Sequence, residues 1–170
     1  MTEAWRLRVW TRFLATADEV WRLKTDPAAL SNEFRPWIWF TMSSADQATL
    51  AAILSEPDGV GRVRARLWPS GVRWDMDIEM LQLGTTYRDR STNGVYREWE
   101  HTHRIIPASD ATVYVDEVRF VPVVPRAKWL ASMTRVLFEH RHYRAAKRLS
   151  AEAGTIGVSV LRLDCPAGSG

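Results

Sequence analysis

The chain has 170 residues, a net charge of +3 and 46% hydrophobic residues, which is enough for one globular domain with a substantial core. Basic and acidic residues are interleaved, so a nucleic-acid partner is not indicated, and no segment approaches the roughly 18 apolar residues that span a bilayer. The single cysteine, Cys165, excludes an intramolecular disulfide and a thiolate zinc site. Because the first residues, MTEAWRLRVW, lack the apolar region of a secretory signal, we expect a cytoplasmic protein.

The N-terminal part predicts a strand followed by two short helices. Residues 5–14 alternate apolar and arginine side chains, which is typical of a half-buried strand. Asp18 or Thr16 can cap the first helix. Pro27 suits the first turn of a second helix that extends to about Glu33. One strand with two short helices behind it is a distinctive opening.

A meander of strands fills the middle of the chain. A strand over 37–42 precedes a helical segment over 44–54, for which Ser44 is the expected cap. Further strands are predicted over 60–68, 72–83, 85–91, 95–106 and 112–122. The strand over 72–83 has the clearest alternation, which places on one face Val72, Trp74, Met76, Ile78 and Met80.

The strand over 95–106 carries the most informative pattern. Alternation places on one face Arg97, Trp99, His101, His103 and Ile105. A packed core rarely holds two imidazoles and a guanidinium beside aromatic side chains, so this face indicates the lining of a pocket. We therefore expect the strand to form one wall of a ligand cavity.

The pairing of this strand with the segment 112–122 decides which groups meet the histidines. If Ile105 lies opposite Thr112, His101 faces Asp116 and His103 faces Tyr114. A register one residue away presents Glu117 and Val115 instead. The chemistry favours the first register, since a carboxylate and a phenol are natural partners for imidazoles.

A long final helix is predicted from Arg126 to about Ala153. Its apolar stripe consists of Trp129, Leu130, Met133, Val136, Leu137 and Leu149, and His140 extends it. This helix is the only element long enough to cover the apolar face of the sheet. We expect an α+β domain over residues 1–153, with a curved antiparallel sheet of about seven strands, and a flexible Gly/Ser/Pro-rich tail over 154–170.

Four motifs occur in a characteristic order. They are TADEVW-x4-DP-x2-L over 16–30, then Tyr96-x2-Trp99-x-His101 followed by Thr112-x3-Asp116-x-Val118-x-Phe120-x-Pro122, the proline-flanked start of the last helix, and Phe138-x2-Arg141. Over about residues 5–150 the chain resembles the START/polyketide-cyclase (SRPBCC) superfamily. The resemblance implies the helix-grip fold and a cavity for a hydrophobic small molecule between the sheet and the last helix. The segment 44–54 departs from the family pattern, as a lid or an added helix.

The superfamily includes polyketide aromatase/cyclases, lipid carriers, hormone receptors and oxygenase subunits, so the fold does not settle the function. His101 and His103 are our candidate acid and base, and Arg97 is the candidate partner of an oxyanion. The residues expected to bind ligand are Trp74, Met76, Ile78, Met80, Tyr87, Trp99, Tyr114, Asp116, Met133, Leu137 and His140. An HxH strand with a carboxylate can also bind a divalent metal, but the sequence offers no convincing third ligand. We therefore expect no metal and no other cofactor.

The leading hypothesis is that the protein encloses a hydrophobic, cyclic or polyketide-like molecule and catalyses a cyclase- or dehydratase-type reaction on it, driven by proton transfers. The alternative is a non-catalytic binder or carrier of a lipid-like or aromatic ligand, in which the histidines affect affinity alone. A third interpretation is an interaction module that forms a homodimer through exposed tryptophans such as Trp10 and Trp68.

Overall fold

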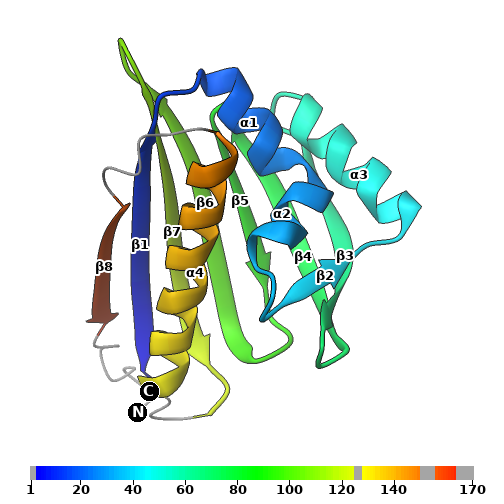
Figure 1. Cartoon of the computed structure of the whole chain (residues 1–170). Coiled ribbons are helices and arrows are strands. Elements are labelled where there is room, and N and C mark those ends of the chain that lie inside the picture. The colour runs from blue at the N-terminus through cyan, green and yellow to red at the C-terminus, as the bar shows by residue number, and fades with distance from the viewer. Residues whose placement is uncertain (1–2, 125–127, 150–155, 164–170) are drawn as a thin grey trace, which may run out of the picture.

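The structure is a computed structural model that describes residues 3–124, 128–149 and 156–163. Figure 1 shows a long sheet with helices laid over one side of it. In chain order, the elements are β1 (Ala4–Phe13), α1 (Ala17–Thr25), α2 (Pro27–Glu33), β2 (Trp39–Thr41), α3 (Ser44–Ser55), β3 (Val60–Trp68), β4 (Val72–Gln82), β5 (Thr86–Ser91), β6 (Tyr96–Pro107), β7 (Thr112–Pro122), α4 (Lys128–Arg148) and β8 (Ile156–Leu163).

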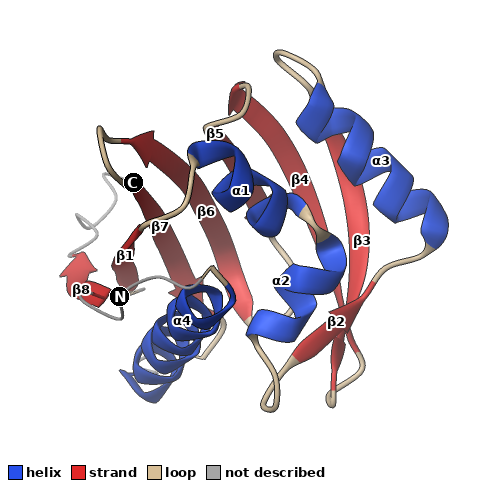
Figure 2. Ribbon diagram, turned by 45° about the horizontal axis from the view of Figure 1, so that its top comes forward, coloured by secondary structure: helices blue, strands red, loops and turns tan. Residues whose placement is uncertain are grey.

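The described strands form one sheet in the order β2-β3-β4-β5-β6-β7-β1-β8, and every neighbouring pair is antiparallel. Figure 2 shows the sheet curving around α4, with α1, α2 and α3 on the same face. Burying one apolar sheet face under helices gives the core its place between the two layers. The α+β helix-grip architecture predicted from the sequence is confirmed.

The two short helices begin as their sequences predict. Thr16 caps α1 in a capping box, where the Thr16 side chain accepts from the backbone N–H of Glu19 and the Glu19 carboxylate accepts from the Thr16 N–H at 2.8 Å. Asp26 caps α2, and Pro27 occupies its first turn. These caps fix where the chain leaves β1 and turns back across the sheet.

The segment 44–54, an expected lid or added helix, is a helix packed on the sheet. Its N-cap is Ser43 and not the expected Ser44, because the Ser43 side chain accepts from the backbone N–H of Asp46. Leu50, Ile53 and Leu54 of α3 are buried against Val63 of β3 and Ile78 of β4. This contact anchors α3 over β3 and β4, at the other end of the same sheet face from α4, which contacts β1.

The C-terminal segment differs from its prediction as a tail. Residues Ile156–Leu163 form β8, an edge strand that pairs antiparallel with β1 and raises the number of strands from about seven to eight. Val158 and Val160 pack partly against the core, and the indole of Trp10 fills the space that a side chain on Gly157 would need. The other residues of the predicted tail, 154–155 and 164–170, lie outside the described residues.

The apolar stripe predicted for the last helix does not coincide with the buried face of α4, which is rotated from it by part of a turn. Trp129, Met133 and Val136 are about half exposed, whereas the buried face consists of Leu130, Ala131, Thr134, Phe138, Arg141, His142, Ala145 and Ala146. Charged and polar groups are buried here because they pair with groups on other elements, so hydrophobic periodicity does not mark this face.

The predicted ends of the last helix, Arg126 and Ala153, lie outside the described residues. None of the helices in the described part of the chain has the length and apolar character of a membrane span.

Candidate functional site

A cavity of about 530 Å³ lies between the sheet and the helices α2, α3 and α4. Its wall is mostly aliphatic and aromatic, and the volume falls within the range of small-molecule sites. Seven of the predicted ligand-binding residues line it, namely Trp74, Met76, Ile78, Tyr87, Trp99, Met133 and Leu137. Trp68, Val95 and Trp129 also line it and are exposed, so they mark its mouth.

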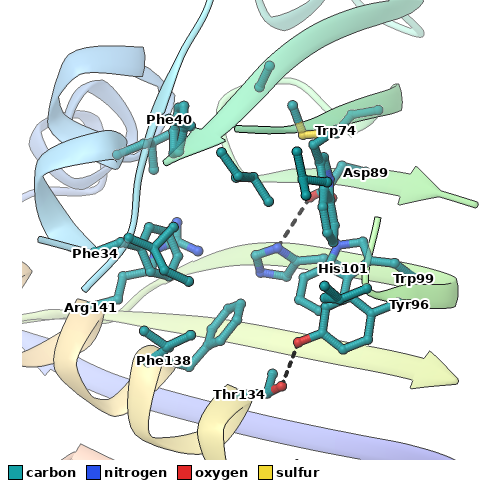
Figure 3. A pocket seen from close by; sticks show the side chains of 18 of the residues that line it. Phe34, Phe40, Trp74, Asp89, Tyr96, Trp99, His101, Thr134, Phe138 and Arg141 are labelled. Carbon is teal, nitrogen blue, oxygen red and sulfur yellow. Dashed lines mark hydrogen bonds and ion pairs between the residues drawn. The ribbon is translucent and has the colours of Figure 1, made fainter. Parts of the chain in front are cut away.

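The inner part of the cavity carries a polar cluster. Asp89, His101, His103 and Arg141 all line the cavity, and each is at most 6% exposed. Figure 3 shows Asp89 and His101 joined between Trp74 and Phe138, with Arg141 approaching from α4 beside Phe34. An apolar chamber with a few convergent polar groups is typical of a ligand site.

His101 sits between two carboxylates. Its Nε2 lies 2.9 Å from Asp116 Oδ1, and its Nδ1 lies 3.2 Å from Asp89 Oδ2. Because carboxylate oxygens accept, each nitrogen is placed to donate, which favours the imidazolium form. Burial lowers the pKa of His101, but Asp89 and Asp116 outweigh it and the pKa is raised overall.

His103 has a different environment on the same strand face. Its Nε2 lies 3.1 Å from Asp89 Oδ2 and its Nδ1 lies 2.9 Å from the Tyr114 hydroxyl, while its ring stacks on Tyr87 with 3.9 Å between centroids. Burial and the nearby charge of His101 lower the pKa of His103 to about 3. The two neighbouring imidazoles therefore favour opposite protonation states at neutral pH.

Tyr114 and Asp116 join the two histidines behind the cavity wall. The Tyr114 hydroxyl donates to Asp116 Oδ1 at 2.5 Å and lies within hydrogen-bonding distance of His103. Since this hydroxyl carries a single proton, Asp116 and His103 compete for it. Together with Asp89, these four residues form a closed ring of hydrogen-bonding groups.

Arg141 links this ring to a second set of buried charges. Its Nη1 lies 3.1 Å from Asp116 Oδ2, and its Nε donates to Glu33 at 2.9 Å. Lys24 binds the same Glu33 carboxylate at 2.8 Å. His142 Nε2 lies 3.0 Å from the same oxygen, Asp116 Oδ2. Burial raises the pKa of Asp116, but Arg141 and then His101 hold it well below its usual range.

The buried charges balance when His101 is protonated. Asp89, Asp116 and Glu33 supply three negative charges, and Lys24, Arg141 and His101 supply three positive ones. Such balance matters because an unpaired buried charge is strongly destabilising.

The prediction for Arg97 is wrong in its placement. A bulge in β6 between Tyr96 and Glu98 interrupts the alternation, so Tyr96 is buried in the cavity wall and Arg97 is exposed. Tyr96 instead shares a hydrogen bond of 2.7 Å with Thr134, as Figure 3 shows. The guanidinium at the cavity belongs to Arg141.

The strand register also differs from the prediction. Ile105 pairs with Tyr114 and His103 pairs with Asp116, which is two residues from the expected pairing. A shift of two keeps every side chain on its face. The predicted contacts of His101 with Asp116 and of His103 with Tyr114 therefore form diagonally.

Two other predicted residues lie away from the cavity. His140 contacts Trp37 and lies 2.7 Å from the carbonyl oxygen of Arg35 on the outer side of α4, beside a separate surface hollow. Met80 is buried under α3.

The tryptophans proposed for self-association differ in exposure. Trp10 is half-buried and Trp68 is 38% exposed at the cavity mouth, and self-association through them stays a prediction.

Several residues of the cluster were not predicted from the sequence. Asp89 shares the inward face of β5 with Tyr87, so its position two residues after a predicted wall residue was a usable signal. Arg141 lies one helical turn after Phe138 in a motif that the sequence shows. The sequence does not indicate the burial of Lys24, Glu33 and His142, because a helical pattern does not show which polar side chains are buried with a partner.

Comparisons with known proteins agree with this architecture. A family model described as a domain of unknown function (DUF8410) matches residues 11–149. No curated protein matches the sequence. Solved structures with the same fold include a START superfamily protein from Mycobacterium smegmatis, at 12% identity and a TM-score of 0.64, with 86% of this chain and 97% of that chain covered.

Two further structures are similar. The Zhui aromatase/cyclase from Streptomyces sp. R1128 is 15% identical, with a TM-score of 0.64 over 89% of this chain and 98% of that chain. A protein from Thermus thermophilus is 17% identical, with a TM-score of 0.59 over 84% and 98% of the two chains. These similarities confirm the START-like (SRPBCC) fold that the sequence predicts.

Proposed function

The chain belongs to the family described as a domain of unknown function (DUF8410), and we propose that it encloses a hydrophobic, polyketide-like molecule and catalyses a cyclase- or dehydratase-type reaction on it. The observation that carries this proposal is the apolar cavity with His101, His103, Asp89 and Arg141 at its inner end. The similarity to an aromatase/cyclase adds support from the fold.

The apolar wall suits the body of the ligand, and the polar cluster suits the reacting end. Burying apolar surface contributes roughly 25 cal/mol per Å², so the wall supplies affinity without selecting a single compound. An oxygen of the ligand meets charged or imidazole groups only at the inner end, because the rest of the described lining is apolar apart from a few hydroxyl and indole N–H groups. The ligand is thereby oriented with its oxygenated end toward the two histidines.

The chemistry assigned to the site is a ring closure with loss of water. A base removes a proton from the carbon next to a carbonyl, that carbon bonds to a second carbonyl carbon, and an acid protonates the oxygen of the second carbonyl to give a hydroxyl group. Water is then lost when a base removes a second proton from the same carbon and an acid protonates the departing hydroxyl. His103 is assigned as the base because it is neutral at neutral pH, although the pKa of about 3 makes it a weak base. His101, whose pKa is raised, is assigned as the acid. The ring centroids lie 3.8 Å apart, and Tyr114 with Asp116 offers a path that returns the proton between them.

One observation favours a second candidate function, a non-catalytic carrier. Both nitrogens of His101 and of His103 are already engaged by protein groups, so catalysis requires a ligand to compete with these hydrogen bonds. A carrier uses the same cluster only to hold the polar end of its cargo.

Mass spectrometry of the purified protein incubated with a small-molecule extract of its source cells separates the two functions. We expect conversion of one compound in many-fold molar excess, lost in His101→Ala and His103→Ala and retained in the surface control His140→Ala. Retention of one unaltered compound per chain would instead establish a carrier. Unchanged turnover in both cavity variants would refute the acid–base assignment.

A further inference from the structure

We propose that Asp89, His101 and His103 form a binding site for one divalent transition-metal ion at the inner end of the cavity. The three residues come from the adjacent strands β5 and β6. Asp89 Oδ2 lies 3.2 Å from His101 Nδ1 and 3.1 Å from His103 Nε2, and one ligand atom from each of the three residues lies within 4.8 Å of the other two. The third ligand that the HxH pattern lacked in the sequence is Asp89.

These separations suit coordination of a single ion. Imidazole nitrogen and carboxylate oxygen bind zinc at about 2.0–2.2 Å. Two ligands at about 2.1 Å from an ion, separated by angles of 90–110°, lie about 3.0–3.4 Å from each other. The two nitrogen–oxygen distances fall inside that interval, and both involve the same carboxylate oxygen, Asp89 Oδ2.

Each proposed ligand is held from behind by a second buried group. His101 presents Nδ1 to the site and its Nε2 faces Asp116 at 2.9 Å. His103 presents Nε2, and its Nδ1 faces the Tyr114 hydroxyl at 2.9 Å. Asp89 presents Oδ2, and its Oδ1 accepts from the indole N–H of Trp99 at 2.9 Å. Metal-binding histidines and carboxylates are characteristically oriented by such outer partners.

The donor set and its position indicate the kind of ion and its use. Two nitrogens and one oxygen suit zinc, iron, cobalt or manganese, whereas calcium and magnesium prefer oxygen ligands alone. Three protein ligands leave positions free for water or substrate, and all three residues line the cavity. The use of the ion on a substrate oxygen rests on the proposed ring closure, in which the ion would take the place of the acid–base roles assigned to His101 and His103. Ion binding itself does not rest on that function.

The charge of the cluster favours an anion as an additional ligand. The six buried charges balance when His101 is the imidazolium, with a proton on Nδ1 as well as on Nε2. A divalent ion that replaces the Nδ1 proton leaves the cluster with one extra positive charge, which hydroxide or an enolate oxygen of the substrate would neutralise. The ion would thus hold a negatively charged oxygen at the end of an apolar chamber.

Metal binding can be measured directly with zinc and cobalt. We would titrate Zn²⁺ into tag-free, chelator-treated protein against a chromophoric chelator, and record the visible absorption of Co²⁺-loaded protein. We expect one ion per chain. Asp89→Asn and His103→Gln should weaken the affinity by at least about 100-fold, and Trp99→Phe by about 10–100-fold. The surface control His140→Ala should bind like the unmodified chain.

A second measurement covers the case in which a cavity variant does not fold. Zinc X-ray absorption of the unmodified, zinc-loaded protein should show two imidazole ligands. No stoichiometric ion, an ion without two imidazoles, or full affinity in folded Asp89→Asn would each overturn the proposal.

The two proposals fail separately. Turnover that persists in the presence of chelator, without ion binding, overturns the metal site and leaves the proposed function standing. Binding of one ion without turnover of any compound supports the site and refutes the enzymatic function.

Discussion

Replacing Arg141 by methionine removes the cation that joins the two halves of the buried cluster. Arg141 is 1% exposed and contacts Glu33 at 2.9 Å, Asp116 at 3.1 Å and the Tyr114 hydroxyl at 3.0 Å. Removing one partner of a buried ion pair costs about 3–5 kcal/mol. Because Glu33 keeps Lys24 and Asp116 keeps two histidines, we expect the lower end, about 3 kcal/mol.

Equilibrium unfolding in urea, followed by tryptophan fluorescence, measures this loss through the midpoint at constant slope. For a chain of this size the melting temperature should fall by roughly 6–12 °C. The matched control is Arg135→Met on the same helix, whose side chain is 54% exposed and pairs with Glu139 one turn away. An exposed pair of this kind contributes only about 0.3–0.5 kcal/mol. Equal losses in the two variants would refute the reasoning that Arg141 neutralises buried carboxylates.

Three further predictions concern other parts of the fold. Thr16→Ala removes the α1 cap and should cost about 1 kcal/mol in urea unfolding; an unchanged midpoint would contradict this. Burial lowers the pKa of His142, so as the pH falls native His142 takes up a proton later than the same residue in the unfolded chain, which does so near pH 6.5. Stability from this group is present above that pH and lost below it, so between about pH 7.5 and 5.5 the unmodified chain should lose more stability than His142→Gln; equal losses would count against burial. Gly157→Val places a side chain where the Trp10 indole lies and should speed hydrogen exchange of the β1 amides that face β8, whereas unchanged exchange would show that the strand pairing tolerates it.

The elements that the sequence predicted are those with a local cause. Alternation identifies β1, β3, β4, β6 and β7, since one face is buried and the other solvated. The cap at Thr16 and the proline at position 27 are readable because each residue lies at the start of the helix it favours. By contrast, β8 depends on pairing with β1 at the other end of the chain, which no local pattern announces.

The site was predictable where it follows the alternation of side chains between the two faces of a strand. His101 and His103 were found because alternation puts them inward with Trp99, and even a register error of two residues kept their partners on the correct face. Arg97 was predicted on the wrong face because a β-bulge interrupts the alternation of side chains at that position. Arg141 and His142 occupy buried helix positions that hydrophobic periodicity assigns to solvent, since only the folded structure brings Asp116 to them.

The central claim is that the cavity holds a small molecule with its polar end at the histidine cluster. Ala65 lines the cavity and is 5% exposed, so Ala65→Phe should fill part of it, whereas Ala51→Phe adds the same ring on the exposed face of α3. Native mass spectrometry of each protein after incubation with the source-cell extract tests the claim most directly. We expect one small molecule or its product per chain in the unmodified protein and in Ala51→Phe, and none in folded Ala65→Phe. Equal capture by all three proteins, or capture by none, would contradict the account.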